Sequence, residues 1–201
     1  MRYLGLILGL VMFAGVVNAQ TADDVAKIES YLNSVKSMEA RFIQTASNGN
    51  STQGKLYIQK PNKLHMVYDA PVDVLIVGDG QHIIYNDKEL DQVTHIDYDD
   101  IPAAIILGNQ IKIDGKNLKI TKFYKDAGTT VATVEQSKNG DIGPIKLVFS
   151  NDPLELKQWS IVDPQSVEIT VSLYDIENNK NLDSGLFKFR KSKGAPGYRG
   201  K

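Results

Sequence analysis

The chain contains 201 residues with a formal net charge of −1, and none of them is cysteine. This near-neutral balance argues against a nucleic-acid-binding protein, which needs a basic face. The lack of cysteine excludes thiol catalysis, thiolate metal sites and disulfides, so burial of apolar surface must stabilise the fold. The length is suited to a single domain.

The first 19 residues predict a secretory signal peptide. Arg2 precedes an uncharged apolar stretch from Tyr3 to Val17, and Val17-Asn18-Ala19 fits the small-x-small cleavage pattern. A membrane anchor is the alternative, but the stretch is shorter than the roughly 20 residues that a spanning helix needs. We therefore expect cleavage after Ala19 and one exported domain over residues 20–190. Residues 191–201 lack apolar side chains to pack and predict a disordered tail.

An amphipathic helix is predicted over residues 22–35. Thr21 is a suitable N-cap, and Asp23 and Asp24 in the first turn meet the positive end of the helix dipole. The apolar residues recur at intervals of three, four and three, which places them on one face: Val25, Ile28, Leu32 and Val35.

The rest of the chain is dominated by strand patterns. Apolar runs are separated by turn signals such as Asn48-Gly49 and Asp79-Gly80, as in antiparallel hairpins. No crossover helices intervene, so we expect a mainly β fold: an antiparallel sheet of ten or eleven strands that curls, with helices on one side. The predicted strands cover residues 38–45, 54–59, 64–68, 74–77, 81–85, 118–124, 130–136, 145–149, 156–162, 166–174 and 186–189.

The stretch from Lys60 to Thr94 organises the sheet. Side chains two residues apart share a face of a strand. If the Pro61-Asn62 turn preserves the register, one surface is therefore lined by Leu56, Ile58, Leu64, Met66 and Tyr68. The run from Val74 to Val77 is apolar on both faces, so we expect it to be covered on both.

A second, short helix is predicted from Ile101 to Leu107. Pro102 suits its first turn, Gly108 suits its end, and Asp99 or Asp100 suits its cap. Because this segment is almost entirely apolar, it is either part of the core or a cover over an apolar groove.

No catalytic constellation is visible in the sequence. The three histidines (His65, His82 and His95) lack metal-ligand spacing and fit polar, outward positions of half-buried strands. Nothing selects a pair of catalytic carboxylates, and no phosphate-binding loop or nucleophile motif is present, so we expect no enzyme activity, cofactor or metal. A carrier of an apolar ligand accounts for export, a curled apolar sheet and a small apolar helix, although composition alone also fits an ordinary core.

Several motifs in order resemble the LolA family of outer-membrane lipoprotein carriers. The resemblance covers nearly all of the predicted mature chain. It is carried by KPNKLHMVYDAP, LIVGDGQHIIYND and LDQVT within residues 60–94, by Phe42-Ile43-Gln44, by Gly54, Leu56 and Ile58, by Pro102 to Leu107, by the strand around Trp159, and by Phe187 and Phe189.

The resemblance implies an incomplete antiparallel β-barrel whose apolar cavity holds the acyl chains of lipoproteins beneath a lid helix. It implies a monomeric periplasmic carrier that accepts lipoproteins from an inner-membrane ABC transporter and delivers them to an outer-membrane receptor. The implied cavity residues are Leu56, Ile58, Leu64, Met66, Tyr68, Ile105 and Ile106.

Lys60 is the implied lid latch and is also a departure from the family. The family usually has Arg before the proline, bonded toward the lid, whereas Lys offers a point charge without the planar fork. The proline that follows the final F-x-F in the family is also missing, so the resemblance does not define the C-terminal end of this chain. The alternative function is a periplasmic lipid-binding or envelope-stress sensor module with the same half-barrel.

Overall fold

The computed structural model describes residues 21–136 and 143–190. The predicted signal peptide and the predicted tail after Arg190 therefore lie outside the described residues. Within them, eleven strands form one antiparallel sheet, which confirms the predicted fold class, although β6 was not among the predicted strands. The strands are β1 (Ser37–Ala46), β2 (Ser51–Gln59), β3 (Lys63–Tyr68), β4 (Val74–Asp79), β5 (Ile83–Asp87), β6 (Gln92–Ile96), β7 (Leu118–Lys125), β8 (Thr129–Gln136), β9 (Ile145–Asn151), β10 (Leu154–Val162) and β11 (Glu168–Asn178).

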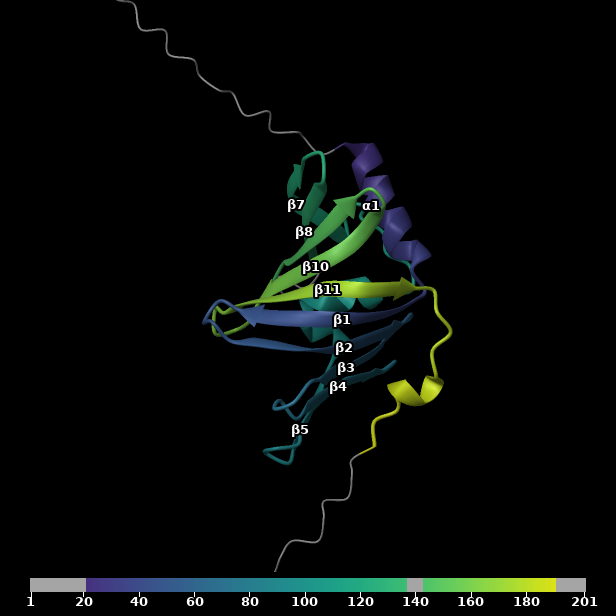
Figure 1. The fold of residues 1–201 in the computed structure, drawn as a ribbon. Helices are drawn as coiled ribbons and strands as arrows, with labels where there is room; N and C mark the ends of the chain where they lie inside the picture. Colours follow the sequence, from purple (N-terminus) through teal and green to yellow (C-terminus); the bar gives the residue numbers. More distant parts are fainter. Residues whose placement is uncertain (1–20, 137–142, 191–201) are drawn as a thin grey trace, which may run out of the picture.

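The sheet is antiparallel throughout and does not close. Its strand order is β6-β5-β4-β3-β2-β1-β11-β10-β9-β8-β7, so two meanders meet where β1 pairs with β11. Figure 1 shows these two strands side by side across the middle of the molecule, with β2 to β5 on one side and β7 to β10 on the other. The outermost strands are β6 and β7, which pair with one neighbour each, so the barrel is incomplete.

Helix α1 (Ala22–Ser34) confirms the predicted N-terminal helix. Thr21 caps it: its hydroxyl accepts from the Asp24 backbone N–H, and the Asp24 carboxylate accepts from the Thr21 backbone N–H. This reciprocal pair satisfies two of the N–H groups that a helix start leaves open. Ile28 and Leu32 are buried against the sheet, and Val35 ends the helix as its C-cap.

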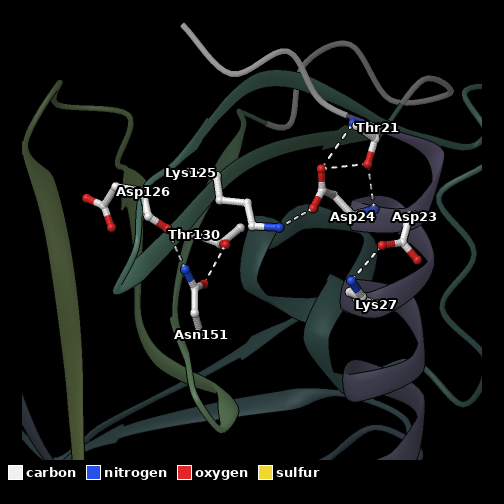
Figure 2. Close-up of polar contacts among 8 residues, drawn as sticks. All are labelled: Thr21, Asp23, Asp24, Lys27, Lys125, Asp126, Thr130 and Asn151. Atoms are coloured by element: carbon white, nitrogen blue, oxygen red, sulfur yellow. Dashed lines mark hydrogen bonds and ion pairs between the residues drawn. The ribbon is translucent and has the colours of Figure 1, made fainter. Parts of the chain in front are cut away.

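The first turn of α1 is also tied to strand β7 (Figure 2). The ammonium of Lys125 pairs with the Asp24 carboxylate at 2.5 Å, and the hydroxyl of Thr21 donates to the same carboxylate at 2.7 Å. These partners hold the pKa of Asp24 at about 2, below its usual 3.8. The ion pair between Asp24 and Lys125 therefore fixes the start of α1 to β7.

The predicted register around Lys60 is confirmed. Leu56 pairs with Met66 and Ile58 pairs with Leu64 across β2 and β3, so these side chains share one face. Asn62 in the connecting turn has φ 56, a left-handed conformation that asparagine tolerates better than most residues. We call the face that carries Leu64 and Met66 the inner face and the opposite one the outer face.

Two short 3₁₀ helices lie between β6 and β7: η1 (Tyr98–Asp100) and η2 (Pro102–Leu107). Helix η2 confirms the position, first-turn proline and Gly108 end predicted for the second helix, and Figure 1 shows it behind β1 and β11. The predicted Asp cap is wrong. Asp99 and Asp100 lie inside η1, and the N-cap position of η2 is Ile101, which makes no side-chain capping bond.

The predicted last strand, residues 186–189, is also wrong. Residues Ser184–Phe187 form the 3₁₀ helix η3, because the Asp183 carboxylate accepts from the Gly185 N–H and turns the chain. Phe187 then packs as a single buried anchor on the outer face. The alternation in LFKF therefore reflects one buried anchor, Phe187, beside half-buried Leu186 and Phe189 and exposed Lys188.

Helix η3 covers the outer face of β3 and β4. Val77 and Ile84 face each other across β4 and β5, and both are buried although they point away from the inner face. His65, directly opposite Val77 on β3, shares a hydrogen bond of 2.7 Å with the carbonyl of Leu186. The run from Val74 to Val77 was expected to be covered on both faces, and this is confirmed only in part: Val77 is buried on the outer face, whereas Val74, Leu75 and Ile76 stay half-buried.

Candidate functional site

An apolar cavity of about 280 Å³ lies between the inner face of the sheet and η2. Its walls come from both halves of the sheet, and η2 covers it. The lining residues are Gln44, Ile58, Leu64, Met66, Tyr68, Ile76, Ile83, Tyr85, Ile96, Ile101, Ala103, Ala104, Ile106, Leu107, Trp159, Ile161, Ile169 and Val171. Because almost all of these side chains are apolar, the cavity is suited to an apolar ligand.

Five of the seven cavity residues named from the sequence line this space: Ile58, Leu64, Met66, Tyr68 and Ile106. The other two are placed differently. Leu56 is fully buried between Ala40 and Met66 of the neighbouring strands, and Ile105 is buried in the core beside Ile106. Neither side chain lines the cavity.

The opposite wall was not identified from the sequence. Trp159 and Ile161 of β10, with Ile169 and Val171 of β11, face Leu64 and Met66 across the cavity. Their strands were predicted, and the alternation within each strand was visible. The missing information was which of the two faces turns inward, because that depends on how far the sheet curls.

The cover is fixed to the turn between β2 and β3. The Asn62 backbone N–H donates to the carbonyl of Leu107, the last residue of η2, at 3.0 Å. The Asn62 carbonyl accepts a hydrogen bond from the hydroxyl of Tyr98, the first residue of η1. Ile105, Ile106 and Leu107 are all buried in this arrangement. Residues 98–107 are thus tied at both ends to one turn residue.

Tyr98 reaches Asn62 across Gly78 of β4. A Cβ atom at position 78 would lie 2.5 Å from the Tyr98 hydroxyl oxygen and 3.1 Å from the Leu64 Cβ. Gly78 is therefore required by close approach of the tyrosine, not by its own backbone conformation.

Lys60 contacts α1 rather than the cover. Its ammonium donates to the carbonyl of Leu32 at 2.6 Å, near the C-terminal end of α1. A cation is favourable there because the last helical carbonyls lack partners and carry the negative end of the dipole. Partial burial and the nearby charge of Lys36 outweigh this favourable effect and lower the pKa of Lys60 to about 8. The Lys60 side chain also borders a void of about 20 Å³ with Ile106 of η2.

A second, polar groove of about 470 Å³ lies beside the start of α1. It is bordered by Asp24, Lys27 and Lys125, which belong to the ion pairs that fix the helix (Figure 2). Thr130 donates to the Asn151 side chain at 2.7 Å on its floor. These polar groups already bond one another, so we assign the groove to helix anchoring.

The family described as "Outer membrane lipoprotein carrier protein LolA" matches residues 33–190. The chain belongs to the LolA family. The match spans β1 to β11 and therefore includes both the sheet and η2, which together enclose the cavity.

Relatives within the LolA family agree over nearly the whole length. An outer-membrane lipoprotein carrier protein of Azotobacter vinelandii is 27% identical over 94% of each chain. One from Legionella pneumophila (strain Corby) is 28% identical, over 96% of this chain and 97% of the relative. A solved structure of a DUF1329 family protein from Desulfovibrio piger shares the fold, with a TM-score of 0.50 and 11% identity, over 82% of this chain and 95% of its own.

The structure describes no helix long and apolar enough to span a bilayer within residues 21–136 and 143–190.

Proposed function

We propose that this protein carries acylated lipoproteins across the periplasm and holds their acyl chains in the cavity beneath η2. The main support for this proposal is an almost wholly apolar cavity in a member of the LolA family, whose relatives are named lipoprotein carriers. Each buried methylene group contributes about 0.8 kcal/mol, so long acyl chains need an apolar cover in water. The role requires no chemistry and no cofactor.

In this proposal, loading displaces η2. The closed cavity, about 280 Å³, is at the lower limit of small-molecule pockets, which measure roughly 300–1,000 Å³. Room for several acyl chains is therefore made by moving η2. Opening uncovers Ile106 and Leu107, at roughly 1.5–3 kcal/mol for each side chain left in water. This cost reduces the net affinity for cargo and permits release.

Lys60 retains a proposed part in this equilibrium. Its ammonium holds the end of α1, while its side chain borders the same small void as Ile106. A change at Lys60 therefore alters the packing of α1 against η2. The latch acts through α1 rather than by a direct bond to the cover.

The proposed partners follow from the cargo. Lipoproteins are taken from an inner-membrane ABC transporter and given to an outer-membrane receptor, and the predicted signal peptide, which would direct export, supports a location between the two membranes. Ile58, Leu64, Met66, Tyr68 and Ile106 are the proposed acyl-chain contacts of the closed cavity. Leu56 is buried on the same face beside Met66, and Ile105 is buried next to Ile106, so both support the proposed contacts.

The test is a release assay with the chain that starts at residue 20. Inner-membrane vesicles that contain lipoprotein and an active transporter are incubated with the protein and ATP, and lipoprotein is measured in the soluble fraction. We expect lipoprotein to co-purify with the protein. The Azotobacter vinelandii relative is the positive control. If that relative releases lipoprotein and this chain does not, the carrier function is wrong, and the sensor alternative is favoured.

A further inference from the structure

Polar side chains are confined to one part of the apolar cavity. Besides the indole of Trp159, the polar lining residues are Gln44 on β1, Tyr68 at the end of β3 and Tyr85 on β5. The Tyr68 hydroxyl donates to Gln44 Oε1 at 2.8 Å. An apolar cavity that also carries a few placed polar groups has the composition of a site that orients its ligand.

A gap in the sheet surface lets Tyr68 and Gln44 meet across β2. Tyr68 pairs with Gly54, and Gly54 pairs with Phe42 on β1. Because Gly54 has no side chain, the Tyr68 ring crosses β2 and contacts the Phe42 ring edge-on, with 5.2 Å between the ring centroids. A Cβ atom at Gly54 would lie 2.9 Å from the Phe42 ring. The pair is therefore built into the backbone pattern of three strands.

This group has hydrogen-bond donors without partners. Within the described part of the chain, neither the amide nitrogen of Gln44 nor the hydroxyl of Tyr85 makes a hydrogen bond. Burial, with the neighbouring Tyr85, raises the pKa of Tyr68 to about 12, so its phenol stays protonated at neutral pH. In either orientation of the Gln44 amide, the pair keeps an unused N–H or O–H donor. When a ligand excludes water from the cavity, such donors are unfavourable unless the ligand supplies an acceptor.

We propose that Gln44, Tyr68 and Tyr85 form a subsite for the carbonyl oxygen of an acyl ester or acyl amide. The inference rests on the proposed function, in which the cavity holds acyl chains. A carbonyl oxygen only accepts hydrogen bonds, which matches a group of donors, and in any acyl lipid it is bonded to the carbon at which the hydrocarbon chain begins. The subsite fixes the head end of the chain at Gln44, with the hydrocarbon against Leu64 and η2.

The test compares two lipids that differ only in this carbonyl: dioctanoylglycerol, a diester, and dioctylglycerol, the matching diether. Trp159 is the only tryptophan of the chain and lines the cavity, so its fluorescence reports binding of either lipid. Each net hydrogen bond corresponds to roughly a threefold to tenfold gain in affinity. We expect the diester to bind about tenfold more tightly.

The readout is the ratio of the two affinities. Gln44→Leu and Tyr85→Phe should each reduce this ratio toward one, whereas general damage to the cavity would weaken both lipids and preserve the ratio. Gln53→Leu, an exposed change on the outer side of β2, should keep the wild-type ratio.

Equal affinity for diester and diether in the wild type, or an unchanged ratio in both cavity variants, overturns the subsite and leaves the carrier function standing. If neither lipid binds the wild-type protein, the acyl cavity itself is wrong, and the subsite is overturned with it.

Discussion

The backbone N–H of Asn62 holds the carbonyl of Leu107 at 3.0 Å, and this bond joins the end of η2 to the turn that begins β3. The carbonyl of Asn62 also accepts a hydrogen bond from the Tyr98 hydroxyl. Leu64, two residues further along the chain, forms the cavity wall. The cover and the wall are therefore held by one turn, and closure depends on backbone geometry there as well as on apolar contact.

Gly78→Ala should loosen the cover. The new methyl group would lie 2.5 Å from the Tyr98 hydroxyl, and overpacking of this kind costs about 1–3 kcal/mol. Tyr98→Phe alone removes the bond to Asn62 and should cost about 0.5–1.5 kcal/mol. In the double variant, the loss of unfolding free energy should be smaller than the sum of the losses in the two single variants. The reason is that phenylalanine lacks the hydroxyl oxygen with which the new methyl group would clash. Urea unfolding of the four proteins measures the coupling.

The matched control for this cycle is Gly128→Ala. A Cβ atom there has its nearest neighbour at 4.0 Å, in the turn between β7 and β8, so we expect a change within about 0.5 kcal/mol. Strict additivity of Gly78→Ala and Tyr98→Phe would show that the tyrosine hydroxyl does not occupy the space above Gly78.

Leu64→Glu should block cargo binding while the protein stays soluble. Leu64 lines the cavity opposite the β10–β11 wall, and a carboxylate there would have to remain hydrated or be neutralised when acyl chains enter. We expect loss of lipoprotein release in the vesicle assay. Gln53→Glu, which places the same charge on an exposed outer position of β2, should release lipoprotein normally. Normal release by Leu64→Glu would remove Leu64 from the acyl-chain path.

The near wall of the cavity was predictable because it depends only on local rules. Alternation along β2 and β3, with a turn that keeps the register, is enough to place Ile58, Leu64 and Met66 together. The far wall was not predictable in this way, because Trp159 and Ile161 face the cavity only as a result of the twist and curl of the whole eleven-stranded sheet. That curvature is the sum of many small rotations between strands, and no single residue encodes it.

The contacts that close the site were hidden for a different reason. Asn62 acts through its backbone, so its side chain carries no signal of the bonds to Leu107 and Tyr98. Gln44 was visible only as part of the F-x-Q motif, because its partner Tyr68 is two strands away. Lys60 was found from its motif, but its bond to Leu32 depends on where α1 docks.

The stability contributed by Lys60 should rise with pH. Its pKa is about 8 in the folded protein and 10.5 when exposed. Between these values the unfolded chain binds a proton that the folded one does not, so the free energy of unfolding increases with pH. Relative to Lys60→Met, the wild type should therefore gain stability from pH 8 to pH 10 and show no such trend from pH 6 to pH 7. Urea midpoints at each pH measure the difference, with exposed Lys55→Met as baseline; parallel curves for wild type and Lys60→Met would contradict the burial of this ammonium.

The charge pair at the start of α1 should be lost in acid. The pKa of Asp24 is about 2 in the folded protein against 3.8 when exposed, because Lys125 and Thr21 bond the ionised carboxylate. Its contribution is therefore complete above pH 3.8 and disappears as the pH falls through 2. Asp24→Asn should destabilise by about 1–2 kcal/mol at pH 7, through loss of the capping box and the ion pair. In urea unfolding, the difference in unfolding free energy between Asp24→Asn and the wild type should become smaller between pH 4 and pH 2. The control is Asp23→Asn at an exposed position, which should change stability little at any pH. A gap that stays constant down to pH 2 would show that the carboxylate charge does not anchor α1.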